Sequence, residues 1–218
     1  MDAATLNLDF GTTKRSFLYR RGTTDEVAIV QALKIGAYKF GQLRRAKELA
    51  DFYDQLAQTA KPPLIVDAGA SIGASALYFA FTYPKAHLVA IEPEQDNFQL
   101  LVSNTAQLPI ECRCAMASAY ERSAPPVTRL SINEIYSDRS QIANPFIVKL
   151  EIERCETELF FVNTEWLDRT PIIILQLQDC LIPGTKNSRA FVECVANRNR
   201  DFIYLHDCIF SIDRQLVH

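Results

Sequence analysis

The sequence lacks three features that would each define a class of protein. It has no strong excess of charge, because 23 lysines and arginines stand against 26 aspartates and glutamates, for a net charge of −3. A nucleic-acid surface needs clustered positive charge, so no nucleic-acid partner is expected. No apolar run approaches the ~20 residues that cross a bilayer, so no membrane partner is expected either. The opening stretch MDAATLNLDF lacks the basic and apolar regions of a signal peptide, and we expect a cytoplasmic protein.

Cysteine and histidine are too scattered to predict a metal site. Cys112 and Cys114 form a close pair, but zinc sites need a histidine or a second cysteine pair nearby, and neither is present. We therefore expect no metal. Most of the six cysteines lie inside apolar stretches, as free thiols in a reducing cytoplasm do; they are Cys112, Cys114, Cys155, Cys180, Cys194 and Cys208.

The sequence does contain enough apolar side chains for one well-packed unit, since 48% of its 218 residues are hydrophobic. We expect residues 1–60 to form an N-terminal hairpin and helical cap and residues 61–218 to form the main domain. A first helix after Thr24 or Asp25 would bury Val27, Val30 and Leu33, and a second would cover residues 42–57. Because the first stretch is rich in β-branched residues, a short strand stays open as the alternative there.

From residue 64 onward, predicted strands and helices alternate. The segments LIVDA, HLVAIEP, IECRCAMA, PFIVKLEIE and PIIILQLQD predict five strands. Helices are predicted after the strands: one ends at Tyr83, one covers 94–106, one ends at Leu167, and one covers about 188–196. The last segment, DFIYLHDCIFSID, predicts two short strands around a tight turn. This alternation predicts an α/β fold with a doubly wound, mostly parallel seven-stranded sheet.

The stretch VDAGASIGASALYFA, residues 66–80, supports two functional interpretations. Residues 69–73 fit G-x-S-x-G, the nucleophile elbow of serine hydrolases, with Ser71 as the nucleophile. The same residues form a glycine loop between a strand and a helix, where free backbone N–H groups and the helix dipole can face a nucleotide-like ligand. Ligands of doubly wound sheets bind at this position, beyond the carboxyl ends of the strands.

Glu92 favours the cofactor interpretation. It ends the next strand roughly twenty residues later, where an acid can accept both hydroxyls of a ribose. Side chains at Ser71 and Ala74 would crowd the pyrophosphate of a dinucleotide, so the loop suits a ribose ligand without phosphates. S-adenosylmethionine is the common ligand of that kind. The alternative is that Gly69 and Gly73 serve only a tight turn and close packing.

A serine hydrolase is the weaker interpretation. Few residues precede the loop, and none of them forms the oxyanion stretch that a nucleophile elbow needs. A triad of Ser71, Asp179 and His206 nevertheless keeps the right chain order and stays open.

Three blocks of the sequence resemble the FkbM family of methyltransferases, a branch of the class I S-adenosylmethionine-dependent enzymes. LIVDAGASIGASALYFAFTYPKAHLVAIEPEQDNFQLLVSNT is similar to the family's first block, and FIVKLEIERCETELF to the second, usually K-I-D-I-E-G-A-E. IIILQLQDCLIPGTKNSRAF is similar to the third, usually E-L-H-D before a P-G-T turn. The resemblance implies a Rossmann-like methyltransferase fold, S-adenosylmethionine as cofactor, and O-methylation of a small molecule such as a sugar or natural product. The sequence leaves open whether the protein forms a homodimer.

The resemblance also implies a cofactor site. The glycine loop would frame the methionine part, Glu92 would hold the ribose, and residues after the third strand would read the adenine edge. For Asn97, surface capping or packing is an equal alternative. The implied set is Asp67, Gly69, Ala70, Ser71, Gly73, Glu92, Pro93, Asn97, Ala117 and Ser118.

The acceptor side departs from the family pattern. Arg154 replaces a glycine, and Gln176 and Gln178 stand where the family has Glu and His. Arg154 could grip an anionic acceptor in a bidentate pair, or it could be an exposed arginine at the start of a helix. Gln178 could orient an acceptor but cannot take its proton.

The candidate catalytic bases are Glu151, Glu153 and Asp179, with the two glutamates favoured. The alternative for these acids is that they cap the next helix or pair with Lys149 and Arg154. A cofactor-binding relative with lost or altered methyl transfer, acting as a partner or regulatory protein, therefore stays open.

Overall fold

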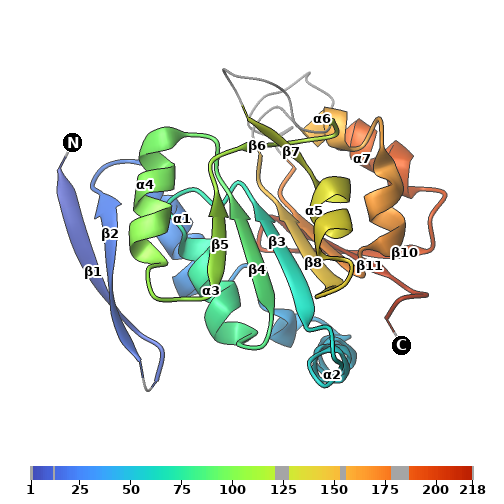
Figure 1. The fold of residues 1–218 in the computed structure, drawn as a ribbon, viewed down its shortest axis with the longest axis horizontal. Coiled ribbons are helices and arrows are strands. Elements are labelled where there is room, and N and C mark those ends of the chain that lie inside the picture. Colours follow the sequence, from blue (N-terminus) through green and yellow to red (C-terminus); the bar gives the residue numbers. More distant parts are fainter. Residues whose placement is uncertain (1, 12, 121–127, 153–155, 178–186, 218) are drawn as a thin grey trace.

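The computed structural model describes residues 2–11, 13–120, 128–152, 156–177 and 187–217 of the chain. A seven-stranded sheet in the order β10-β11-β9-β8-β3-β4-β5 forms its centre (Figure 1). β11 runs antiparallel to both of its neighbours, and every other pair in this sheet is parallel. The predicted α/β fold with a mostly parallel seven-stranded sheet is confirmed. Its strands are β3 (Pro63–Ala68), β4 (His87–Ile91), β5 (Ile110–Arg113), β8 (Asn144–Leu150), β9 (Ile172–Leu175), β10 (Arg200–Leu205) and β11 (Cys208–Asp213).

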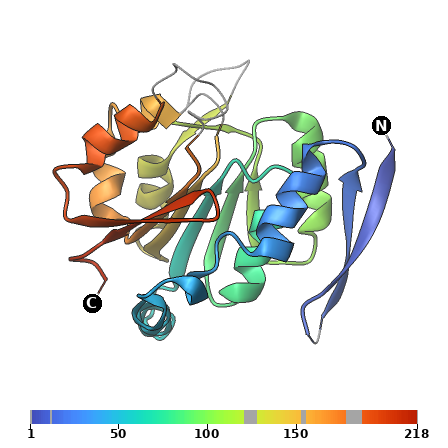
Figure 2. The same cartoon turned by 180° about the vertical axis from the view of Figure 1, so that it is seen from behind.

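Helices cover both faces of this sheet, as Figures 1 and 2 show from opposite sides. Successive residues of one strand point to opposite faces, so Ile65 packs into one apolar core and Val66 into the other. The first core includes residues of α3 (Ala74–Thr82) and α4 (Gln95–Asn104). The second includes residues of α5 (Ile132–Arg139), α6 (Glu156–Leu159), the 3₁₀ helix η3 (Thr164–Arg169) and α7 (Asn187–Val195).

The N-terminal segment packs into the first of these cores. Its predicted hairpin is confirmed as β1 (Ala3–Asp9) paired antiparallel with β2 (Lys14–Arg20). The hairpin is fixed to α4 because the Asn104 side chain bonds both the N–H and the C=O of Leu18, at 2.7 and 2.9 Å. Four helical pieces follow: α1 (Thr24–Ile29), the π-helix η1 (Val30–Ile35), the 3₁₀ helix η2 (Phe40–Gln42) and α2 (Ala46–Leu56).

The first helix buries a different face from the predicted one. Val27 and Val30 are 60% and 36% exposed, whereas Ile29 and Ala32 are buried. Asp25 and Ile29, four positions apart, form the buried face of α1, and the winding then changes to the wider π form at Val30. Thr23, not Thr24 or Asp25, is the N-cap. The predicted burial of Val27 and Val30 and the alternative of a strand are therefore wrong.

Two other predicted elements are divided in the structure. The segment IECRCAMA forms β5 and then a separate strand, β6 (Met116–Ser118), which pairs with β7 (Arg129–Ser131) outside the main sheet. The single helix predicted up to Leu167 is replaced by α6 and η3. Asn163, which precedes η3, has a left-handed backbone with φ of 50°, and this conformation interrupts a helix.

Candidate functional site

The glycine loop, residues 69–73, lies at the point where the winding of the sheet reverses. β3 lies between β4 and β8, and the chain first moves out to β4 and β5 and later returns to β8 on the other side. Figure 1 shows β4 and β8 on either side of β3. Parallel strands end at the same edge, so Glu92 after β4 and Glu151 after β8 flank the loop from its two sides. This is the position at which doubly wound sheets open a ligand crevice.

Both loop glycines are required by local geometry. Gly69 and Gly73 have φ of 77° and 94°, in the region that residues with a Cβ rarely adopt. A Cβ on Gly69 would lie 2.1 Å from the backbone oxygen of Glu151, and one on Gly73 would lie 3.1 Å from Cδ1 of Leu101. Turn conformation and close packing therefore explain both glycines, whatever the loop binds.

The N–H groups at the start of the loop donate within the protein. Those of Gly69 and Ala70 both donate to the carbonyl of Ile91, at 2.9 and 3.0 Å. The N–H of Ser71 donates to Oε2 of Glu92 at 2.9 Å. The prediction that the loop offers free N–H groups is wrong for these three residues. A phosphate site is built from such free groups, so the observed bonding disfavours a phosphate ligand here.

Glu92 is held firmly against the loop. It is only 6% exposed, and while Oε2 accepts from Ser71, Oε1 accepts from the N–H of Glu94 at 3.0 Å and from the amide of Asn97 at 3.3 Å. The amide oxygen of Asn97 in turn accepts from Arg20 at the end of β2. A carboxylate has about four acceptor positions, so Glu92 keeps capacity for a further donor on Oε2.

Arg20 links the contacts of Glu92 and Asn97 to the N-terminal segment. It forms a bidentate pair with Asp25, whose side chain is fully buried, at 2.8 and 2.7 Å. Burial acts to raise the pKa of the Asp25 carboxyl, but the hydrogen bonds and charge of Arg20 outweigh it and lower this pKa. Asp25 was not singled out from the sequence, since no spacing rule connects it with Glu92.

A buried group of charges lies on the other side of the loop. The ammonium of Lys149, in β8, is 2.7 Å from the carbonyl oxygen of Gly69, 2.9 Å from Oε2 of Glu151 and 3.2 Å from Oδ1 of Asp67. Ser75 donates to the other oxygen of Asp67 at 2.6 Å. Burial acts to lower the pKa of Lys149, but the two carboxylates outweigh it and raise this pKa. Lys149 is therefore charged at neutral pH.

Tyr38 brings the N-terminal segment into contact with this group. Its buried hydroxyl donates to Oε2 of Glu151 at 3.1 Å. Burial raises the pKa of Tyr38 well above its usual value, so the phenol stays a neutral donor. Glu151 thus pairs with Lys149, which is the alternative considered from the sequence. The Glu151 side chain is 23% exposed.

The remaining predicted residues are only partly placed at this edge. Ala117 and Ser118 lie on β6, and the Ser118 hydroxyl donates to Glu158 at 2.6 Å. Gln176, directly after β9, accepts from the side-chain amide of Gln31 in η1 at 3.3 Å. The other predicted acceptor-side residues fall outside the described part of the chain; they are Glu153, Arg154, Gln178 and Asp179.

The structure does not bring Ser71 and His206 together. His206 lies in the turn between β10 and β11, with Nε2 2.7 Å from the side-chain oxygen of Gln42. β10 is four places from β3 in the sheet, which is roughly 19 Å at the usual strand spacing. The third triad member, Asp179, is outside the described residues. The geometry therefore does not support His206 as the base of a triad with Ser71.

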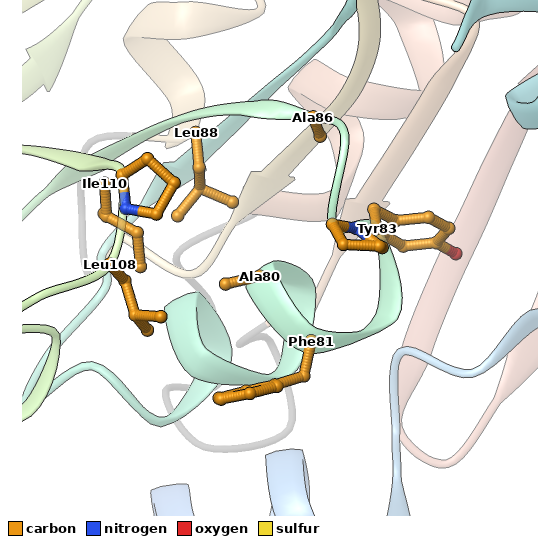
Figure 3. A pocket seen from close by; sticks show the side chains of 9 residues that line it. Ala80, Phe81, Tyr83, Ala86, Leu88, Leu108 and Ile110 are labelled. Atoms are coloured by element: carbon orange, nitrogen blue, oxygen red, sulfur yellow. The ribbon is translucent and has the colours of Figure 1, made fainter. Parts of the chain in front are cut away.

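An apolar pocket of about 220 Å³ lies at the opposite edge of the sheet (Figure 3). It is formed where α3 ends and where β4 and β5 begin, so it does not communicate with the carboxyl ends that carry Glu92 and Glu151. Its lining residues are Ala80, Phe81, Tyr83, Pro84, Ala86, Leu88, Leu108, Pro109 and Ile110.

The described residues form neither a metal-binding cluster nor a membrane-spanning helix. Within them, no group of three or more His, Cys, Asp or Glu side chains is arranged to hold a metal ion. No helix in that part of the chain has the length and apolar character needed to cross a membrane. Four cysteines there are free thiols: Cys112, Cys114, Cys194 and Cys208.

No protein-family model matches the sequence, and a search of curated proteins finds no match. Among solved structures, the chain is similar to several whose names give them as methyltransferases. One is an O-methyltransferase from Bacillus cereus in complex with S-adenosylhomocysteine, with 14% identity, a TM-score of 0.49, and coverage of 86% of this chain and 91% of that one. Another is precorrin-6y C5,15-methyltransferase from Geobacter metallireducens, with 12% identity, a TM-score of 0.45, and coverage of 79% and 89%.

A third similar structure is TrmK from M. capricolum, in complex with the cofactor product S-adenosylhomocysteine. It has 15% identity and a TM-score of 0.40, and the match covers 73% of this chain but only 65% of TrmK. Identities and TM-scores at this level do not transfer a ligand or a reaction. The cofactor and chemistry of this chain are therefore inferred from its own residues.

Proposed function

We propose that this chain is an S-adenosylmethionine-dependent methyltransferase of the FkbM type that acts on a hydroxyl of a small molecule. The observation that carries the proposal is Glu92, a buried carboxylate fixed against the glycine loop at the point where the sheet reverses. A ribose presents two adjacent hydroxyl donors, and the open acceptor position on Oε2 of Glu92 can accept from one of them. The block resemblance to FkbM enzymes supports the finer assignment.

The residues present fit this cofactor. The loop amides that a pyrophosphate would need already donate to Ile91 and Glu92, which favours a ligand without phosphates. Glu92 would hold the ribose, with Asn97 fixing its orientation through the 3.3 Å contact. The loop from Asp67 to Gly73 would hold the methionine part, and Pro93, Ala117 and Ser118 would border the adenine. When bound, the cofactor supplies a methyl group made electrophilic by the sulfonium.

Glu151 is the described candidate for the base. Lys149 and Tyr38 both contact Oε2, and the side chain remains partly exposed, so Oε1 is available to take a proton from an acceptor hydroxyl. Glu153 and Asp179 remain proposals of the same kind, as do Arg154 and Gln178 for acceptor binding.

A second candidate function is supported by the same contacts. The Glu151 carboxylate is already engaged by an ammonium and a phenol, an arrangement that also fits a cofactor-binding relative that has lost methyl transfer. Calorimetry with S-adenosylmethionine, followed by a methyl-transfer assay over a panel of sugars and phenols, separates the two. Methylated product supports the enzyme, whereas tight binding without any product supports the relative.

A further inference from the structure

The two sides of the glycine loop carry more negative than positive charge. On one side, Lys149 is the only cationic group in contact with Asp67 and Glu151 among the described residues, so this group has a net charge of −1. On the other side, Glu92 accepts only from neutral N–H groups in the described part of the chain. Arg20, which lies beyond Asn97, is paired with Asp25.

Among the described residues, the titratable neighbours of the group do not relieve this imbalance. Burial raises the pKa of the Tyr38 phenol well above its usual value and that of the Cys208 thiol to about 12, so both are neutral near pH 7. The Lys149 ammonium already lies within 3.2 Å of three oxygens, those of Gly69, Glu151 and Asp67. A buried excess charge is unfavourable unless a counter-charge approaches it. The site therefore suits a ligand that brings a positive charge to the loop.

We propose that the excess negative charge of Asp67, Glu151 and Lys149 makes the loop selective for a ligand with a positive charge at the reacting sulfur. This inference rests on the proposed function, since S-adenosylmethionine carries a sulfonium and S-adenosylhomocysteine a neutral thioether. The amino and carboxylate groups of the two ligands are the same, so they contribute no selectivity. The product would then be held less tightly than the substrate, and release would follow directly from the loss of charge.

The backbone geometry places the charge close to the ligand. The Glu151 backbone oxygen approaches Gly69 so closely that only glycine fits there, so any ligand on the loop lies beside the end of β8. Because Asp67 is fully buried and Glu151 is 23% exposed, Glu151 is the carboxylate at the border of the site. One unit charge about 6–12 Å away, at an effective dielectric of about 20, changes affinity by about ten- to a hundredfold.

Calorimetry on the wild type and on Glu151→Gln, with three ligands, tests the inference. The ligands are S-adenosylmethionine, S-adenosylhomocysteine, and sinefungin, which carries an ammonium in place of the sulfonium. In Glu151→Gln, we expect the affinity for the two cationic ligands to fall about fivefold or more and that for S-adenosylhomocysteine to change less than about twofold. Tyr38→Phe is the matched control, because it removes a contact to the same oxygen while keeping the charge; it should affect all three ligands equally.

The outcomes separate this inference from the proposed function. If Glu151→Gln weakens all three ligands equally, Glu151 acts by position and the selectivity inference is overturned, while the cofactor assignment stands. The wild type alone supplies a second test, should the variant fail to fold. It must bind S-adenosylmethionine and sinefungin more tightly than S-adenosylhomocysteine, and equal affinities would overturn the inference. A wild type that binds none of the three would overturn the proposed function as well.

Discussion

At the scale of single residues, the site depends on carboxylates held in fixed positions. Glu92 is fixed by backbone N–H groups, and Glu151 by an ammonium and a phenol. Hydrogen bonds to a charged group are stronger than those between neutral groups, so both carboxylates are held in place before any ligand binds.

Replacing Glu92 with alanine tests the ribose contact. Glu92→Ala should weaken binding of S-adenosylmethionine at least tenfold, about 1.4 kcal/mol, because a hydrogen bond from the ribose to a charged group is lost. Glu94→Ala is the control, since Glu94 is exposed and its backbone, not its side chain, contacts Glu92. Titration calorimetry gives both affinities, and equal values for Glu92→Ala and wild type would remove Glu92 from the site.

Substitution of Ser71 distinguishes a transferase from a serine hydrolase. Its backbone N–H, not its hydroxyl, contacts Glu92, so Ser71→Ala should bind S-adenosylmethionine about as well as wild type. A fluorophosphonate probe, which labels activated serines, should leave the protein unlabelled. Labelling that disappears in Ser71→Ala would establish the nucleophile elbow instead.

Lys149 should be the most sensitive charged residue for stability. Lys149→Met would leave Asp67 and Glu151 without their cation in a buried setting, and breaking a buried pair in this way typically costs about 3–5 kcal/mol. Lys47→Met is the control, because Lys47 pairs with Asp51 on the exposed surface and should change stability little. Urea unfolding measures both, and a Lys149→Met protein as stable as wild type would contradict this description of the charges.

At the scale of elements, the loop is shaped by the contact between β3 and β8. Gly69→Ala would place a Cβ 2.1 Å from the Glu151 oxygen at a φ of 77°, so it should destabilise the fold by at least about 2 kcal/mol. Gly41 has open space around its Cα, and Gly41→Ala should be nearly neutral. Thermal unfolding by circular dichroism compares the two variants, and an equally small shift for both would show that β8 can move away from the loop.

The alternation of strands and helices could be predicted because the central strands are buried on both faces and read as continuous apolar runs. β3, β4 and β9 illustrate this, since nearly all of their residues are buried. Elements that depend on tertiary contacts could not be predicted. α5 was missed because SINEIYSDRS is largely polar and its buried Tyr136 bonds the distant Thr170. The face of α1 was wrong because its buried side carries a charged residue, Asp25, which pairs with Arg20 of β2.

At the scale of the whole molecule, the N-terminal segment contacts the site from two directions. The hairpin reaches Glu92 through Arg20 and Asn97, and it reaches the loop through Asn104, which also donates to the carbonyl of Ile72 at 2.8 Å. The segment after η1 reaches Glu151 through Tyr38. Figure 2 shows the blue helix formed by α1 and η1 on the same face of the sheet as α3, with the hairpin beyond it at the edge of the molecule.

The candidate site could be predicted only where its residues lie close to a motif. Asp67, Gly69 and Glu92 follow from the order of strand, loop, helix and acid. Tyr38 lies 113 positions from Glu151 in sequence and belongs to no motif, so the folded chain was needed to connect them. The same holds for Arg20, whose link to Asn97 spans 77 positions.

Calorimetric titration of the full chain with S-adenosylmethionine, S-adenosylhomocysteine and NAD tests the central claim most directly. The bonding of Gly69, Ala70 and Ser71 disfavours a pyrophosphate, and Glu92 suits a ribose, so we predict binding of the first two ligands and none of NAD. Binding of NAD, or no heat of binding with S-adenosylmethionine, would contradict the account.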